Sequence, residues 1–349
     1  MATRSSVADQ GVATPGRRAQ VMFQILVLVL LVVLLVNYKG AGGLSKIQQA
    51  RATGSLHLPR FKVGADLAGV SSFSNAITYL KIVWPALVFG VLISAAVRTS
   101  LSRMPLHRIF RGGPVRDQVA AALAGAPLML CSCCVAPIFP AVYQRTRRAA
   151  PALGMTLASP SLNPAALTLS FILFPLRVSA ARLAMALILV LVGSLLVARI
   201  TRPRILEVAP TAESGESTWV ELLAGYAKSL AYVSLRTVPL ILVGIWASMW
   251  IMSRLPLTGA VTGARFVSIV IIALFAVLLT LPSLFEIPLA LSVLAAGGPA
   301  GAAAALLFAG PAINLPSLLV IGRYGGWKVA AALAVLVWAI AAAGGLLLG

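Results

Sequence analysis

The chain has 349 residues, of which 60% are apolar and only 10% are charged, and its apolar runs repeatedly reach the ~20 residues that cross a bilayer core. This composition excludes a soluble domain, in which about a quarter of the residues are charged. The net charge of +20 does not indicate a nucleic-acid partner, because the arginines and lysines cluster between apolar segments, as in the cytoplasmic loops of membrane proteins. We therefore expect a multi-pass protein of the bacterial inner membrane, in contact with the lipid bilayer.

The N-terminal region has three predicted elements: a polar cytoplasmic tail (1–20), a transmembrane helix (21–38) and a polar extramembrane segment (39–75). Arg17 and Arg18 stand directly before the apolar run, and no small-residue cleavage site follows it. These flanks are typical of an uncleaved signal anchor, not of a signal peptide that is removed.

Two membrane units follow, a first repeat (76–200) and a second repeat (220–349), joined by a polar linker (201–219). A shift of 151 residues places prolines and polar residues of the first unit on identical residues of the second. The matching pairs are Ser132 with Ser283, Pro137 with Pro288, Pro160 with Pro311, and Asn163 with Asn314. We predict two copies of one unit, which is the usual construction of secondary transporters.

The arginine-rich loops 98–117 and 144–149 decide the topology of the first repeat. If both loops are cytoplasmic, the stretch 119–143 between them must enter the membrane and return. Each repeat then has three crossings and one re-entrant hairpin, and the second repeat is inverted because three is odd. If the stretch crosses fully instead, the repeats are parallel. We expect the hairpin, and an all-α fold with two inverted repeats that meet near the midplane.

The tip of this stretch reads Cys-Ser-Cys-Cys-Val-Ala-Pro and holds all three cysteines of the chain. Pro137 and Pro140 remove helical hydrogen bonds, and unpaired backbone is tolerated at membrane depth only around a cavity. We therefore expect 131–140 to be non-helical and to face a cavity. Thiolates prefer soft metals such as Cu(I) and Zn, and trivalent arsenic is similarly thiol-seeking; the alternative is that the cysteines are small buried hydrophobes. The candidate metal ligands are Cys131, Cys133 and Cys134.

Two later segments, 158–164 (ASPSLNP) and 309–316 (AGPAINLP), combine helix-breaking prolines with an asparagine in apolar surroundings. A discontinuous helix at each place would aim free carbonyls, helix ends and amide side chains at the midplane. The alternative is a kink whose asparagine caps a neighbouring helix. The expected substrate contacts are Ser159, Asn163 and Asn314, in addition to the three cysteines. The expected structural breakers are Pro137, Pro160, Pro164, Pro288 and Pro311.

Glu286 is unlike the other seven acidic residues of the chain, which lie in loops, at helix ends or near the termini. It stands inside an apolar segment between Pro282 and Pro288, at the tip of the second repeat. An intramembrane carboxylate is costly and indicates function. Glu286 is the candidate for proton coupling; the alternative is a protonated side chain bonded to a backbone carbonyl.

These motifs together resemble the predicted permease family of ArsP-type organoarsenical efflux proteins. The resemblance spans about residues 76–349. Relatives in that family are described as copper or zinc exporters, and many have no assigned substrate. The family commonly has glycine where this chain has Cys134, and a third thiol would change the ligand preference. The motifs that carry the resemblance are Cys131-Ser132-Cys133, Pro137, Ala158-Ser159-Pro160, Asn163-Pro164 and Asn314.

The resulting hypothesis is a secondary permease that exports a soft metal or a thiol-reactive metalloid through a cysteine-lined site. The chain has no G-x-x-x-x-G-K-[ST] motif, so it does not itself drive transport with ATP, and we expect neither an enzyme nor a cofactor. One alternative is a transmembrane thiol–disulfide relay that uses the C-x-x-C of Cys131 and Cys134, although the second repeat has no matching thiols. Another is a permease for a non-metal solute with structural cysteines. The sequence leaves open whether the protein forms a homo-oligomer.

Overall fold

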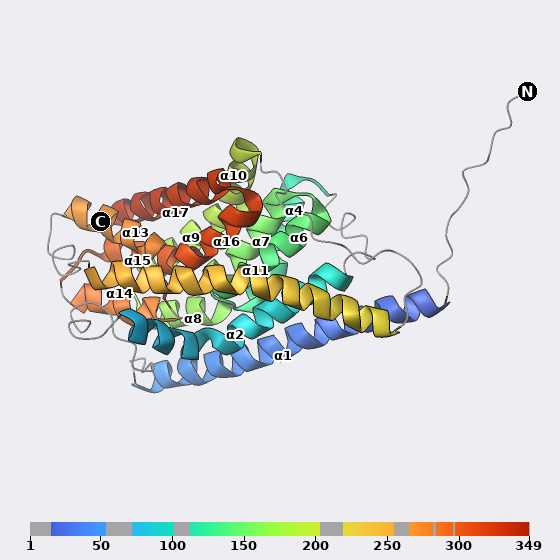
Figure 1. The fold of residues 1–349 in the computed structure, drawn as a ribbon. Coiled ribbons are helices and arrows are strands. Elements are labelled where there is room, and N and C mark those ends of the chain that lie inside the picture. The colour runs from blue at the N-terminus through green and yellow to red at the C-terminus, as the bar shows by residue number, and fades with distance from the viewer. Residues whose placement is uncertain are drawn as a thin grey trace, which may run out of the picture.

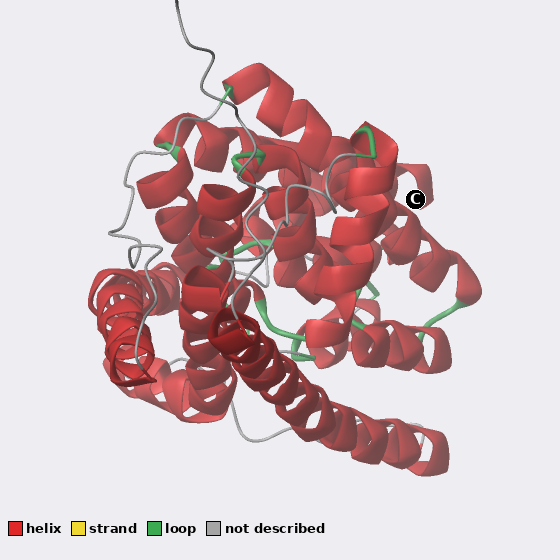
Figure 2. Ribbon diagram, turned by 90° about the vertical axis from the view of Figure 1, so that its right-hand side faces the viewer, coloured by secondary structure: helices red, strands yellow, loops and turns green. Residues whose placement is uncertain are grey.

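The computed structural model describes residues 15–53, 72–100, 112–202, 219–254, 265–281, 284–295 and 297–348. Within these ranges all regular secondary structure is helical and there is no strand (Figures 1 and 2). The predicted all-α class is confirmed.

The helices of the first half lie between residues 15 and 202, with a 3-10 turn after α4 and a π-helical stretch that makes α9 and α10 continuous. They are α1 (Pro15–Thr53), α2 (Ser72–Ser100), α4 (Pro114–Gly125), η2 (Ala126–Leu128), α5 (Ser132–Val135), α6 (Ile138–Thr146), α7 (Ala149–Ser161), α8 (Pro164–Leu173), α9 (Leu176–Leu187), η3 (Ile188–Gly193) and α10 (Ser194–Thr201). Those of the second half are α11 (Trp219–Arg254), α13 (Arg265–Leu278), α14 (Glu286–Ala295), α15 (Ala300–Ala312), α16 (Leu315–Gly325) and α17 (Trp327–Leu348).

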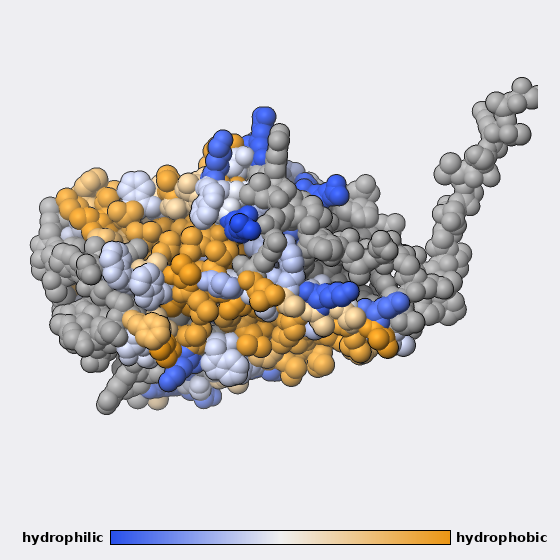
Figure 3. Space-filling view, in the orientation of Figure 1, coloured by the Kyte–Doolittle hydropathy of each residue, from blue (hydrophilic) through white to orange (hydrophobic). Residues whose placement is uncertain are grey.

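Several helices are long and apolar enough to cross a membrane. In the described residues there are four such spans, and up to six if each of two bent helix pairs is counted as one. Apolar side chains cover much of the face drawn in Figure 3. The protein is therefore a membrane protein. The four spans are Ile25–Gln49, Leu176–Thr201, Trp219–Ala247 and Trp327–Leu348.

Helix α1 extends further than the predicted transmembrane helix, which ends at residue 38. It continues to Thr53, because no proline interrupts this part of the sequence. It lies along α2 and α8 (Figure 1), and a Cβ atom on Gly43 would come within 2.9 Å of Ala165 in α8. The glycine therefore permits close contact between these helices. The remainder of the predicted extramembrane segment, 54–71, and most of the predicted linker, 203–218, lie outside the described residues.

The spacing of 151 residues recurs in the helix boundaries. Four helices of the second half begin 151 residues after four helices of the first half. The pairs of first residues are 114 and 265 for α4 and α13, 149 and 300 for α7 and α15, 164 and 315 for α8 and α16, and 176 and 327 for α9 and α17.

Helices α7 and α15, which are partners in this spacing, form the centre of the bundle. All residues of α15 except Ala300 and Pro311 are buried, and most residues of α7 are buried as well. Both helices are rich in alanine and glycine, and such small residues let membrane helices approach closely. A Cβ atom on Gly301 of α15 would lie 2.0 Å from the carbonyl oxygen of Gly345 in α17. This packing holds the ends of α7 and α15, with Pro160 and Pro311, in the protein interior.

Candidate functional site

The first wall of the candidate site is the turn between η2 and α5. The chain changes direction by 117° between the helices before this turn and those after it, as a stretch that enters and returns requires. Met129 adopts the left-handed backbone conformation here, with φ of 50°. The Cys131 carbonyl then begins α5 by accepting hydrogen bonds from the amides of Cys134 and Val135, both at 3.0 Å.

The prediction that 131–140 is non-helical is wrong. The irregular backbone lies at 129–131, whereas α5 and α6 occupy most of the segment that follows. Pro137 lies in the turn directly before α6, and Pro140 lies in the first turn of α6. The amide that proline lacks has no helical partner in a first turn, so proline is tolerated there. These two prolines begin a helix instead of breaking one.

The three thiols converge because of their positions at the start of α5. Cys131 is the N-cap residue, and an N-cap side chain points back over the second and third helical residues, which here are Cys133 and Cys134. The Cys131 sulfur lies 3.1 Å from that of Cys133 and 2.7 Å from that of Cys134, and the latter two are 3.8 Å apart. None of the three forms a disulfide, and all three are buried. One small sphere of this kind can hold a soft metal ion.

Side chains of two neighbouring helices hold the backbone of this turn in place. The Ser159 hydroxyl in α7 accepts a hydrogen bond from the Leu130 amide at 3.0 Å, and the Ser94 hydroxyl in α2 donates to the Pro137 carbonyl at 2.7 Å. Ser159 therefore positions the segment that carries the thiols.

The two proline- and asparagine-containing segments both interrupt a helix, as predicted. Helix α7 gives way to α8, and α15 gives way to α16 with a bend of 47°. Pro160 and Pro311 lie one residue before the end of their helices, and Pro164 is the first residue of α8. Pro288 resembles Pro164, because it lies in the first turn of α14, where a proline is tolerated at the start of a helix.

Both asparagines cap the helix that follows the break. The Asn163 side chain accepts hydrogen bonds from the amides of Ala165 at 3.0 Å and Ala166 at 3.4 Å. The Asn314 side chain accepts from the Ser317 amide at 3.1 Å, and the Ser317 hydroxyl accepts from the Asn314 amide at 3.0 Å. The alternative of a capping role is thus confirmed for each asparagine, although each caps its own following helix.

Glu286, the first residue of α14, is buried and forms an ion pair with Arg182 of α9 at 3.2 Å. The Arg182 side chain is fully buried, and it also donates to the Ala166 carbonyl and the Ser170 hydroxyl of α8. The negative charge of the carboxylate is thus neutralised by the Arg182 guanidinium, which is 104 residues away in the sequence. Arg182, which stands near the start of an apolar span, was not among the predicted site residues. A signal was present, since a charge buried in an apolar segment requires a partner.

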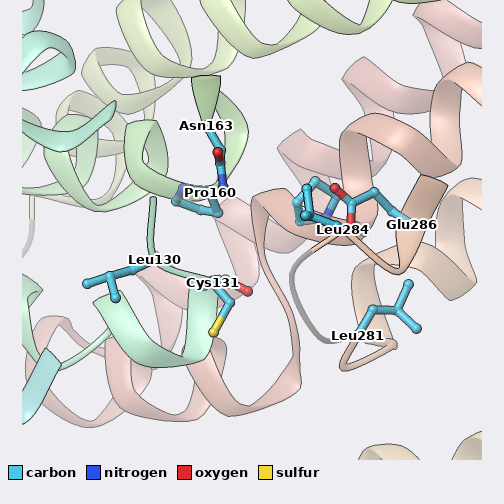
Figure 4. A pocket seen from close by; sticks show the side chains of 10 residues that line it. Leu130, Cys131, Pro160, Asn163, Leu281, Leu284 and Glu286 are labelled. Carbon is cyan, nitrogen blue, oxygen red and sulfur yellow. The ribbon is translucent and has the colours of Figure 1, made fainter. Parts of the chain in front are cut away.

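A small cavity joins the two halves at this site (Figure 4). Its volume is about 10 Å³, room for a water molecule or a single ion. Figure 4 shows Cys131 and Glu286 on opposite sides of the cavity, with the Cys131 sulfur turned away from the carboxylate. The first half contributes Leu130, Cys131, Ser132, Pro160 and Asn163, and the second half contributes Leu281, Leu284, Glu286, Gly310 and Pro311.

The structure divides the predicted site residues into two groups. The first group lines the cavity. Its residues come from the segments 158–164 and 309–316, from the turn between η2 and α5, and from the start of α14. Its members are Cys131, Asn163, Glu286, Pro160 and Pro311. The second group lies in the walls behind the lining. Its members are Cys133, Cys134, Ser159 and Asn314.

Two polar atoms of the surrounding helices, Arg182 Nε and Ser161 Oγ, are buried without a hydrogen-bond partner among the described residues. Buried polar groups are nearly always paired with protein or water. The backbone is also unusual at this place, since Leu284, which lines the cavity, has φ of 77°. Strained backbone and unsatisfied polar groups of this kind concentrate at functional sites.

A helical bundle with membrane-length spans and a polar cavity between its halves has the construction of a membrane permease. The chain belongs to the ArsP-type family of predicted permeases, which matches residues 67–349. It is 26% identical to the UPF0718 protein YraQ of Escherichia coli (strain K12) over 257 residues, which are 72% of this chain and 73% of the relative. It is 30% identical to the UPF0718 protein MJ0584 of Methanocaldococcus jannaschii over 100 residues, 28% of this chain and 27% of the relative. No solved structure matches the chain. Membership of this family indicates a membrane transporter.

Proposed function

We propose that this protein is a secondary permease of the bacterial inner membrane that exports a soft metal or a thiol-reactive metalloid. One observation carries the proposal: a cavity between the two halves is lined by Cys131 from one side and by Glu286 from the other. The cavity thus combines a sulfur ligand with an ionisable group, and both lie in the protein interior. Substrate sites of secondary transporters lie where the repeats meet.

The cysteine cluster suits a soft, thiol-seeking substrate. Three sulfurs bound to one ion at the usual zinc–sulfur distance of about 2.3 Å are about 4 Å from one another. The three sulfurs here are 2.7–3.8 Å apart, so a slight opening of the turn would admit an ion. The substrate would pass from this cluster in the wall into the cavity beside it, by way of Cys131.

Two inverted repeats would provide the alternating access that such export needs. The recurrence of helix boundaries at a spacing of 151 residues supports the repeats. The contacts between them are reciprocal: α6 contacts α16, and α14, which falls on α6 at the 151-residue spacing, contacts α8, as a two-fold relation requires. Helices α4 and α6 lie toward one end of the bundle in Figure 1, and α13 and α14 lie toward the other, which supports inversion.

The ion pair suggests how a proton could be coupled to transport. In this state Arg182 balances the charge of Glu286. A movement of α9 away from α14 would leave the carboxylate in apolar surroundings, where the protonated form is favoured. Separation of the pair would therefore take up a proton, and its re-formation would release one. Glu286 keeps the coupling role that the sequence predicts, with Arg182 as its partner.

Vesicle transport tests the proposal. Everted membrane vesicles that contain the full chain should accumulate Zn²⁺, Cu(I) or methylarsenite when a proton gradient is imposed. Cys131→Ser should reduce the rate at least about tenfold, because one soft ligand is lost from the lining. Glu286→Gln should abolish the response to the gradient. Glu221→Gln removes an exposed carboxylate at the start of α11 and is the matched control. Transport by a triple serine variant of the cysteines at the wild-type rate would refute the role of the thiols.

A thiol–disulfide relay is the second candidate, favoured by the short distance of 2.7 Å between the sulfurs of Cys131 and Cys134. Oxidation of this pair would form one disulfide and release two protons and two electrons to an acceptor such as a quinone. Thiol trapping in growing cells separates the two candidates. A relay requires the pair to alternate between thiol and disulfide, whereas a metal site requires it to stay reduced.

A further inference from the structure

A second and larger cavity, of about 350 Å³, lies between the base of the α4–α6 hairpin and helices α7 and α10. None of the residues that line it lines the central cavity. Its lining residues come from the start of α4, the end of α6, the start of α7 and the end of α10. The loop between α6 and α7 belongs to the arginine-rich stretch that the positive-inside bias places in the cytoplasm.

Four arginines line this second cavity. Arg148 forms an ion pair with Asp117, which is the only acidic residue of the lining. No carboxylate pairs with Arg147, Arg199 or Arg202 in the part of the chain that the structure describes. The cavity therefore has an excess of positive charge.

The backbone fixes two of these arginines in an unusual conformation. Arg147 ends α6 with φ of 52°, and Arg202 ends α10 with φ of 41°. Residues other than glycine rarely adopt this left-handed region, and such outliers concentrate at ligand-binding sites. Both of them border the same cavity.

A buried amide adds a donor that has no partner. Gln118 of α4 lines the cavity and is only 1% exposed. Its Oε1 atom accepts a hydrogen bond from the Ser194 hydroxyl at 3.1 Å, whereas Nε2 has no partner among the described residues. A buried donor without a partner is costly, and an acceptor in the cavity would satisfy it.

The start of α7 supplies further donors. Ala149 and Ala150 line the cavity and carry amide hydrogens there, whereas Pro151, which also lines it, has none. The N-cap residue Arg148 makes no side-chain capping bond. The first amides of a helix have no partner within the helix, and the helix dipole is positive at this end. Helix N-termini are for these reasons common binding sites for anions.

We propose that this second cavity binds a phosphate group, either the headgroup of an anionic lipid or free phosphate. Phosphate accepts several charge-assisted hydrogen bonds at once and is the preferred partner of arginine clusters. Basic pockets between membrane helices on the cytoplasmic side bind anionic headgroups. The bound phosphate would bridge α6, α7 and α10 at the base of the hairpin that carries the cysteines. Pro160 stands nine positions after Pro151 in α7, so these two lining residues of the two cavities are about 14 Å apart along the helix.

Binding can be measured on the purified full chain. In a neutral detergent, inorganic phosphate is titrated at constant ionic strength while the thermal unfolding midpoint is followed. In parallel, the protein is placed in phosphatidylcholine nanodiscs with or without phosphatidylglycerol, and retained lipid is counted by native mass spectrometry. The double variant Arg199→Gln/Arg202→Gln should weaken binding about tenfold or more, because each guanidinium donates a charge-assisted hydrogen bond.

The matched control is Arg116→Gln/Arg177→Gln, which removes the same charge from exposed positions outside the cavity. Retained binding in the control, together with loss in the test variant, supports the proposal. A response to inorganic phosphate identifies free phosphate as the source, and a response only to phosphatidylglycerol identifies the lipid headgroup. Equal loss in both double variants would overturn the proposal, as would wild-type protein that responds to neither probe. If Arg199→Gln/Arg202→Gln does not fold, Arg147→Gln alone provides the same comparison. The proposed transport through the central cavity does not depend on this result.

Discussion

Replacement of Arg182 by methionine should destabilise the protein far more than the same change at an exposed arginine of α9. The Arg182 and Glu286 side chains are 3.2 Å apart and buried. At an effective dielectric constant of about 20, two unit charges at this distance attract each other by about 5 kcal/mol. The variant leaves the carboxylate without its partner, and breaking a buried pair in this way costs about 3–5 kcal/mol. Arg177 is exposed at the start of the helix, so Arg177→Met should change stability by about 0.5 kcal/mol or less.

The loss can be measured by unfolding the purified variants in mixed micelles with increasing dodecyl sulfate, followed by tryptophan fluorescence. A double variant, Arg182→Met/Glu286→Met, separates the ion pair from general packing. Replacement of a buried pair by apolar residues is often neutral or stabilising, so the double variant should be more stable than Arg182→Met alone. The reasoning is refuted if Arg182→Met loses less than about 1 kcal/mol, or if the loss in the double variant equals the sum of the losses in Arg182→Met and Glu286→Met.

Two further predictions concern packing and capping. Gly90→Ala should destabilise the protein by about 1–3 kcal/mol in the same dodecyl sulfate unfolding assay, because the new Cβ atom would lie 2.1 Å from the Cys134 carbonyl oxygen. Gly42→Ala, with no atom within 4 Å of the new Cβ atom, should be neutral or slightly stabilising. Loss of a helix cap should lower the free energy of unfolding by about 0.5–2 kcal/mol in both Asn163→Ala and Asn314→Ala. The rate of vesicle transport should fall more in Asn163→Ala, because only Asn163 of the two lines the cavity. Equal transport by the two asparagine variants would contradict the assignment of Asn163 to the lining.

The helix breaks at 158–164 and 309–316 could be predicted because they depend on features that are local in sequence. Pro160 and Pro311 each lie one residue before the end of a helix, where a missing amide hydrogen disfavours further helix, and an asparagine after each of them caps the next helix. The match of Pro160 with Pro311 and of Asn163 with Asn314 therefore anticipated helix boundaries that recur at 151 residues. The same local rule was misapplied at Pro137 and Pro140, where the position within the first turn decides the effect.

The site could be predicted only in part, because a side chain's neighbours depend on how helices rotate and pack. Cys131, Cys133 and Cys134 converge through the geometry of a single helical turn, so their clustering follows from their spacing. Arg182 and Glu286 come from helices far apart in the chain, and no local pattern pairs them. Ser159 was expected to contact substrate, but packing of α7 turns it toward the Leu130 backbone.

The sequence by itself determined that this is a helical membrane protein with three thiols and a carboxylate inside its apolar segments. These features follow from composition, from the length of apolar runs and from the positions of prolines, all of which act within a few turns of helix. Only the tertiary structure decided that Cys131 and Glu286 face one cavity, that Arg182 balances the carboxylate, and that arginines at the ends of α6 and α10 meet around a second cavity. The physical reason is that these contacts arise from packing between helices, which the pattern along a single helix does not specify.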